Sequence, residues 1–138
     1  MAARSYLDAS VVLRLAFGEP AAFEGLLVDP VTSALCEVEC LRTIDRKLCG
    51  RVLSADQALA ARSRVLALLS ATARVDVTAT VLLRAGQPLP APLGTLDAIH
   101  LGTALLLREQ TGTDVEMVTH DLQLALCARL CGVTVLGV

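Results

Sequence analysis

Short apolar runs alternate with longer helical patterns along most of the chain, and this alternation constrains the fold more than any other feature. Strands separated by helices pair in parallel, because each helix crosses over a face of the sheet between them. Mostly apolar strands suit a sheet that is covered on both faces. We therefore predict an α/β/α sandwich with a central, mainly parallel sheet of about five strands, in a single domain over residues 1–138. The predicted strands are 5–7, 31–32, 74–77, 116–119 and 134–136.

The helical segments carry start and stop signals. Ser54 and Gln57 have the spacing of a capping box, at the start of a helix that runs to about Ala71. Thr95 is the expected N-cap of a helix that ends near Gly112, after a loop containing three prolines. Further helices are predicted at 10–17, 20–27, 33–48, 80–85 and 122–130.

Composition narrows the class of protein. Hydrophobic residues make up 54% of the chain, so a core can form without disulfides or a structural metal. Aromatic residues make up only 2%, which argues against a nucleic-acid-binding surface built on base stacking. The formal net charge is −2, so any nucleic acid would have to be bound by a local basic patch.

The compartment is also suggested by the sequence. No apolar run approaches the roughly 18 residues that a membrane span needs. Asp8 and Arg14 interrupt the first apolar run, which is not typical of a secretion signal. The five cysteines are an odd number without a dense framework, which fits a reducing compartment. We expect a soluble cytoplasmic protein that does not contact a membrane.

Three aspartates stand at related points of the predicted fold. Asp8 follows the first strand, Asp121 follows the fourth, and Asp97 lies in the first turn of an almost wholly apolar helix. Ligands of open parallel sheets bind beyond the carboxyl ends of the strands, so these acids can meet there. Crowded carboxylates repel one another unless a cation such as Mg²⁺ is bound. A bound divalent ion can activate water, which points to phosphodiester hydrolysis.

Each of these acids also has an ordinary structural explanation. Asp121 is well placed to cap the helix that begins at Leu122. Asp97 is favoured in a first turn by the helix dipole. Asp8 could simply begin a turn. Residue spacing by itself leaves both explanations open.

Four motifs occur in order along the chain: YLDAS (6–10), SALCEVECLR (33–42), TLDAIHLGTAL (95–105) and VTHDLQLA (118–125). Together they resemble the motifs of PIN-domain ribonucleases, most closely the VapC toxins of bacterial VapBC toxin–antitoxin pairs. The resemblance spans essentially the whole chain. It implies a PIN-like fold and an endoribonuclease that depends on Mg²⁺, with Mn²⁺ as a possible substitute.

The resemblance also assigns roles to the acids. By position in the motifs, the catalytic residues are Asp8, Glu39, Asp97 and Asp121. Asp8 and Asp97 are the expected main metal ligands, and Glu39 and Asp121 would act directly or through water. Glu37 lies about 200° around the helix from Glu39, so only one of them can face the site. The family motif matches at Glu39, and we expect Glu37 to be exposed.

Several other polar residues lie near the motif acids. Ser10 and Thr119 are expected to support the carboxylates, or bound water, by hydrogen bonds. His100 is interpreted as structural, with a hydrogen bond to the backbone, because its helix is apolar on all sides. His120 stands where related chains often carry tyrosine, and we expect it to be packed or solvated rather than to bind RNA.

A run of cations follows Glu39 on the same predicted helix and its exit. Such residues can hold RNA phosphates, although a solvated helix face explains them equally well. The tentative RNA-binding residues are Arg42, Arg46, Lys47 and Arg51. The pairs Cys36/Cys40 and Cys127/Cys131 lack the short spacings that are usual in zinc sites, so packing is the favoured explanation.

The resemblance further implies partners. The substrate would be structured or single-stranded RNA of the tRNA or rRNA class, and a cognate VapB-like antitoxin would inhibit the enzyme. Homodimers and larger toxin–antitoxin assemblies are expected. Two alternatives stay open: a housekeeping RNA-processing PIN nuclease, and a catalytically inactive PIN-like binding module. A receiver-like phosphate-binding domain is disfavoured because no phosphate-cradling glycine loop is present.

Overall fold

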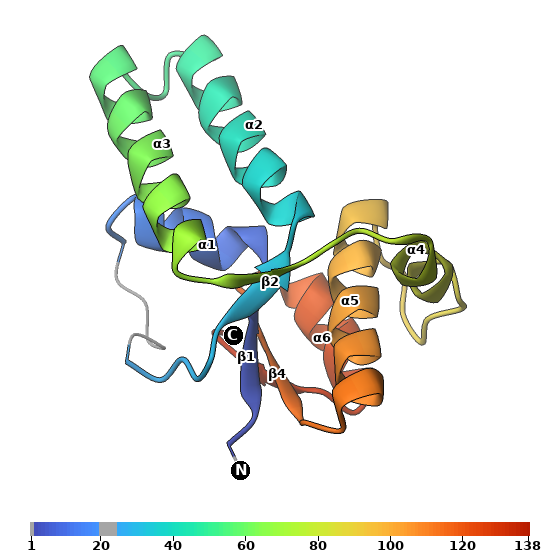
Figure 1. The fold of residues 1–138 in the computed structure, drawn as a ribbon. Helices are drawn as coiled ribbons and strands as arrows, with labels where there is room; N and C mark the ends of the chain where they lie inside the picture. The colour runs from blue at the N-terminus through green and yellow to red at the C-terminus, as the bar shows by residue number, and fades with distance from the viewer. Residues whose placement is uncertain (1, 20–24) are drawn as a thin grey trace.

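The chain builds its sheet from strands that alternate with helices, as the computed structural model shows for residues 2–19 and 25–138 (Figure 1). The alternation confirms the predicted α/β organisation. The elements are β1 (Arg4–Leu7), α1 (Ala9–Ala16), β2 (Val31–Ser33), α2 (Leu35–Cys49), α3 (Ala55–Ser70), β3 (Ala73–Val75), α4 (Ala79–Ala85), α5 (Thr95–Thr111), β4 (Val115–Val118), α6 (Leu122–Leu130) and β5 (Thr134–Leu136).

The strands form one sheet in the order β3-β2-β1-β4-β5, and every neighbouring pair is parallel. Tyr6 of β1 is in register with Val31 of β2 on one side and with Met117 of β4 on the other. The chain therefore winds outwards from β1 in one direction and from β4 in the other. The connections leaving β1 and β4 diverge, and this point of a parallel sheet is where a ligand crevice opens.

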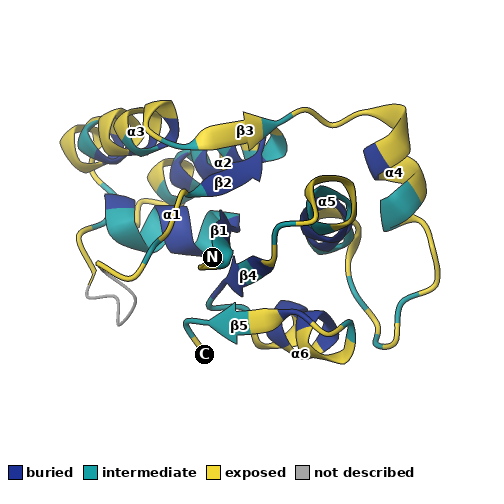
Figure 2. Ribbon diagram, turned by 60° about the horizontal axis from the view of Figure 1, so that its bottom comes forward, coloured by how far each residue is buried: buried dark blue, intermediate teal, exposed yellow. Residues whose placement is uncertain are grey.

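Helices cover both faces of the sheet, because successive strand residues point to opposite sides. Leu7 and Val118 pack against α1, α2 and α3 in one core. Tyr6 and Met117 pack against α5 and α6 in the other. Figure 2 shows the central strands as mainly buried and the edge strand β3 as mainly exposed. This arrangement confirms the predicted α/β/α sandwich.

The structure contains most of the helix start and stop signals that were predicted from the sequence. The capping box of Ser54 and Gln57 is present at the start of α3, and Gly112 ends α5 in the left-handed conformation. The prediction of Thr95 as an N-cap was wrong. Gly94 holds that position with an extended backbone, no side chain caps the helix, and Thr95 is already helical.

Part of the predicted helix at 20–27 lies outside the described residues, namely 20–24. The remainder, 25–27, is not helical. No helix in the described part of the chain is long and apolar enough to cross a membrane.

Candidate active site

Asp8 is buried where β1 ends and α1 begins, with only 3% of its surface exposed. Its Oδ1 accepts hydrogen bonds from Ser10 Oγ at 2.6 Å and from the backbone N–H of Val11 at 3.3 Å. Its Oδ2 accepts one from Thr119 Oγ1 at 2.7 Å. Burial raises the pKa of Asp8 above its usual range, although the bonds from Ser10 and Thr119 oppose the shift. The carboxylate is therefore held in one orientation at an energetic cost.

The loop after β4 is held next to Asp8 by hydrogen bonds. Thr119 Oγ1, which donates to Asp8, also accepts the backbone N–H of Asp121 at 3.0 Å. The backbone N–H of His120 donates to Ser10 Oγ at 3.0 Å. Ser10 and Thr119 thus stand as hydrogen-bond supports of a motif carboxylate, in the positions that we expected. These contacts join the ends of β1 and β4 at the point where the two chain directions diverge.

Asp121 caps α6, because its Oδ1 accepts the backbone N–H of Leu124 at 2.8 Å. The ordinary structural explanation for this residue therefore holds. The cap does not remove Asp121 from the acidic cluster, since its negative charge acts on Asp97. A single side chain can serve both purposes because a carboxylate has two oxygens.

Asp97 is half-buried in the first turn of α5. Burial, followed by the charges of Asp121 and Asp8, raises the pKa of Asp97 to about 6. Glu39 adds to the same shift, and His100 opposes it. Acids from three other segments of the chain are therefore close enough to Asp97 to raise its pKa.

Glu39 faces this cluster from α2, and only 15% of its side chain is exposed. Glu37 is on another side of the same helix. It pairs with Arg74 at 3.2 Å, and 38% of its side chain is exposed. The helical period and the motif match had selected Glu39, and the two environments agree with that choice.

The predicted hydrogen-bond partner of His100 was wrong. Instead of bonding to the backbone, its Nε2 lies 2.5 Å from Glu39 Oε1, and its Nδ1 lies 2.8 Å from Tyr6 Oη. Burial opposes protonation of His100, but the hydrogen bond and the charge of Glu39 raise its pKa above the usual value for histidine. The sequence did contain a sign that His100 belongs to the site, because it follows Asp97 by three residues and both side chains therefore lie on one face of the helix. The apolar residues around the motif suggested a buried structural histidine instead.

The acidic cluster suits a hard divalent cation. Its donors are carboxylate oxygens, and the pKa of Asp97 is raised by burial and then by the neighbouring negative charges, which a cation would offset. Among the described residues, no group of three or more His, Cys, Asp or Glu side chains is arranged so that it could hold a metal ion. Mg²⁺ does not require such a group, because it usually keeps several waters and takes one or two carboxylates.

Most of the cysteines are packed in the interior of the protein. All five are free thiols, and Cys36, Cys40 and Cys127 are buried. The Sγ atoms of Cys36 and Cys40 lie 3.9 Å apart in hydrogen-bonding contact. Neither Cys36 and Cys40 nor Cys127 and Cys131 form a disulfide.

The four basic residues that were predicted to bind RNA lie in different places. Arg42 and Arg46 line a hollow of about 250 Å³ beside Glu39, where Arg42 also pairs with Asp45. Lys47 lies 5.1 Å from the centre of the Phe17 ring and lines a second hollow.

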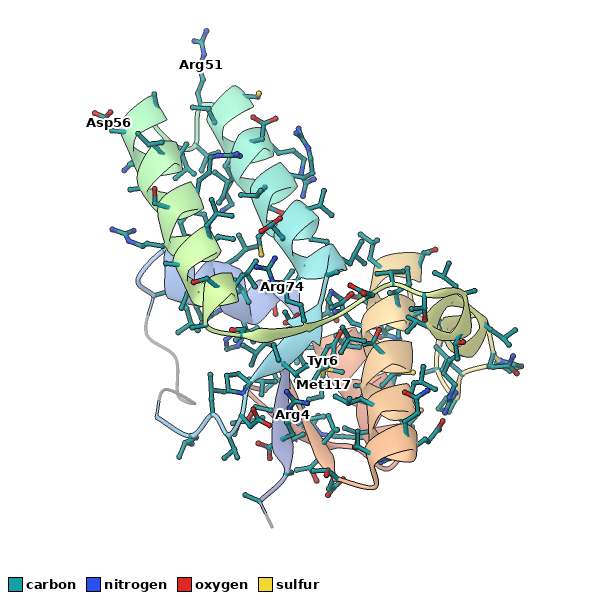
Figure 3. All side chains as sticks on the ribbon, viewed as in Figure 1. Arg4, Tyr6, Arg51, Asp56, Arg74 and Met117 are labelled. Carbon is teal, nitrogen blue, oxygen red and sulfur yellow. The ribbon has the colours of Figure 1, made fainter. Side chains whose placement is uncertain are left out.

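The second hollow has a volume of about 180 Å³ and is also lined by Ser10 and His120. His120 Nδ1 lies 3.1 Å from the carbonyl oxygen of Gly137. Arg51 is elsewhere. Figure 3 shows it pointing outwards at the tip of the hairpin formed by α2 and α3.

Comparisons with known proteins found similarities that extend over nearly the whole chain. Residues 5–128 match the sequence model of a family described as the PIN domain. Ribonuclease VapC46 of Mycobacterium tuberculosis (strain ATCC 25618 / H37Rv) is 34% identical over 138 residues, which cover 96% of this chain and 95% of that protein. The crystal structure of PAE2754 from Pyrobaculum aerophilum has a similar fold, with a TM-score of 0.61 at 20% identity, over 98% of this chain and 92% of that one.

Proposed function

This chain belongs to the PIN domain family as a VapC-type nuclease, and we propose that it hydrolyses phosphodiester bonds in RNA with the help of a divalent cation. The observation that carries the proposal is the electrostatic strain at Asp97. A half-buried carboxylate with a pKa of about 6, surrounded by other acids, does not stabilise a fold. Such groups are typical of functional sites, where a bound ion or substrate relieves the strain.

Asp8 and Asp97 would hold the ion, which is Mg²⁺ or Mn²⁺ in this proposal. When bound, it supplies Lewis acidity, lowers the pKa of a water molecule and offsets negative charge at the phosphate. Glu39 and Asp121 complete the acidic pocket, directly or through water. Ser10 and Thr119 keep the Asp8 carboxylate in one rotamer, so that little reorganisation is needed during the reaction.

The RNA backbone would lie over the neighbouring cations. Arg42 and Arg46 flank Glu39 on one side, and Lys47 flanks Ser10 on the other. Guanidinium and ammonium groups in these places can hold phosphates on either side of the bond that is cleaved. Since aromatic residues make up only 2% of the chain, substrate choice would depend on RNA shape and polar contacts.

We further propose that the protein acts in the cytoplasm as the toxin of a type II toxin–antitoxin pair. A VapB-like antitoxin would silence it by covering the acidic pocket, with a basic residue placed among the carboxylates. Homodimers and larger toxin–antitoxin assemblies belong to this proposal. The relative named Ribonuclease VapC46 supports this assignment, because the identity extends over nearly the full length of both chains.

The direct test compares Asp97→Asn with Asp56→Asn. Both substitutions neutralise an aspartate in the first turn of a helix, but Asp56 lies at the tip of the α2–α3 hairpin (Figure 3). The purified proteins are incubated with total tRNA and rRNA, with Mg²⁺ or Mn²⁺ and with EDTA. We expect cleavage by the wild type and by Asp56→Asn, a loss of at least about 100-fold in Asp97→Asn, and no cleavage in EDTA. Cleavage that persists in EDTA would contradict the metal-dependent mechanism.

Expression in a bacterial host separates the toxin from the two alternatives. The wild type should arrest growth, while Asp8→Asn should not, because asparagine can still cap α1 but carries no charge. RNA cleavage without growth arrest would favour a housekeeping nuclease. RNA binding without cleavage would favour an inactive binding module. Growth arrest by both the wild type and Asp8→Asn would rule out the proposed nuclease toxin.

A further inference from the structure

We propose that His100 is a positioning residue that fixes the Glu39 carboxylate against the acidic cluster, and that Tyr6 in turn fixes the ring of His100. This inference rests on the proposed function and adds two residues to its site. It is carried by a chain of two side-chain hydrogen bonds, one buried and one partly buried, that connects three elements of the fold: β1, α5 and α2.

The first contact restrains a flexible side chain. Glutamate has three rotatable side-chain bonds, and ordering such a chain costs conformational entropy. Glu39 projects from α2, whereas Asp97 belongs to α5. The 2.5 Å contact between His100 Nε2 and Glu39 Oε1 ties the glutamate to the helix that carries Asp97. One oxygen of Glu39 is thereby fixed, and the position of the other follows from it.

The second contact restrains the imidazole ring. His100 is only 1% exposed, and its Nδ1 lies 2.8 Å from the hydroxyl oxygen of Tyr6. The rings meet edge to face at an interplanar angle of 73°. With both nitrogens engaged, the ring cannot turn without losing a hydrogen bond. Because Glu39 is a carboxylate, His100 Nε2 must be the donor in that bond.

Tyr6 connects the His100–Glu39 pair to the sheet, because it belongs to β1. It is the one tyrosine of the chain, it is fully buried, and it precedes Asp8 by two residues on β1. The strand that places Asp8 at the site therefore also anchors Glu39, through Tyr6 and His100. Asp8 and Glu39 are held relative to one common element, although they are far apart in the sequence. Supporting residues of this kind typically alter metal affinity by 10- to 100-fold when they are removed.

The test measures Mn²⁺ affinity by titration calorimetry, with no RNA present. His100→Leu removes the donor, whereas the amide of His100→Gln can replace Nε2 as a donor to Glu39. Leu101→Ala is the control for stability alone, since Leu101 is a buried neighbour on α5 that packs in the core around Tyr6. We expect His100→Leu to weaken Mn²⁺ binding about 10-fold and His100→Gln to recover most of that loss. Tyr6→Phe should have a smaller effect, and Leu101→Ala should lower stability without changing the affinity.

A double-mutant cycle with Glu39→Gln separates positioning from a general loss of structure. If His100 acts through Glu39, adding His100→Leu to Glu39→Gln should weaken Mn²⁺ binding no further. Wild-type affinity in His100→Leu, or losses that simply multiply in the double variant, would overturn the inference. Failure of the proposed function gives a different result, because the wild type itself would then bind no Mn²⁺, and the positioning role would fall with it.

Discussion

Thr119 and Asp8 are separated by 111 residues in the sequence, yet the hydroxyl of Thr119 donates a 2.7 Å hydrogen bond to the carboxylate of Asp8. The bond crosses from the end of β4 to the end of β1, where neighbouring connections leave the sheet in different directions. It opposes the rise in the pKa of Asp8 that burial causes. The stability of the fold and the charge of the site therefore depend on the same contact.

Replacing Thr119 with valine should affect both properties. Thr119→Val keeps the shape of the side chain but removes the donor to Asp8 and the acceptor for the Asp121 N–H. We expect the free energy of unfolding to fall by about 1–3 kcal/mol and the pKa of Asp8 to rise further above its usual range. Urea unfolding and an NMR titration measure these quantities. Thr119→Ser retains the hydroxyl and should resemble the wild type, so equal losses in both variants would contradict this role.

Gly137 lies against the same threonine. Its φ of +111° and a Cβ position only 2.4 Å from the carbonyl oxygen of Thr119 leave no room for a side chain. Gly132 also has a positive φ, of +77°, but nothing lies within 4 Å of its Cβ position. We expect Gly132→Ala to lower the free energy of unfolding by about 1 kcal/mol and Gly137→Ala to lower it by more.

Only Gly137→Ala should also reduce RNA cleavage per folded molecule, because the added methyl group displaces Thr119. Thermal unfolding and cleavage rates measure the two effects. Similar effects of both substitutions would show that the close approach to Thr119 has no importance for the site.

The raised pKa of Asp97 predicts how stability depends on pH. The folded protein binds a proton at Asp97 with a pKa of about 6, above the ordinary value near 4. The folded state therefore holds more protons than the unfolded state over this range, and stability falls as the pH rises through it. Asp97→Asn should stabilise the metal-free protein at pH 7.5, by about 1 kcal/mol after allowance for solvent screening, and much less at pH 4.

Adding Mn²⁺ at pH 7.5 should reverse that order. Ligand binding stabilises the folded wild type by mass action, whereas Asp97→Asn lacks one of the two proposed metal ligands and should gain much less. Calorimetric unfolding with and without Mn²⁺ gives both comparisons, and Asp56→Asn controls for the loss of one negative charge. A gain from Asp97→Asn that does not change between pH 4 and pH 7.5 would contradict the assigned repulsion.

The cations beside the acids should contribute to RNA binding according to their position. Arg46 lines the hollow next to Glu39, while Arg51 lies at the tip of the hairpin, past the end of α2. Cys49, the last residue of α2, is already roughly 15 Å along the helix axis from Glu39, at 1.5 Å per residue. We expect Arg46→Ala to raise KM several-fold and to reduce the salt dependence of binding by about one phosphate contact. Arg51→Ala should have a smaller effect in steady-state assays, and an equal effect would place the RNA along the whole hairpin.

The sequence alone determined the alternation of strands and helices, the parallel sheet and the motif acids. These features depend on local patterns, since the spacing of apolar residues reports which side of an element is buried. The choice between Glu37 and Glu39 was possible for the same reason, because a helix turns by a fixed angle per residue. The motif match then indicated which side faces the site.

Only the tertiary structure decided the strand order, the contact of Gly137 with Thr119 and the partners of His100. Periodicity can place His100 on the same face as Asp97, but it cannot say what lies opposite that face. The pairing of His100 with Glu39 joins residues 61 positions apart and depends on how α2 and α5 pack around one sheet. Arg51 follows Glu39 on the same predicted helix and its exit, yet it lies far from the acids because α2 extends beyond the sheet. Local sequence patterns set the direction of each side chain within its own element, whereas the packing of whole elements decides which distant side chains meet.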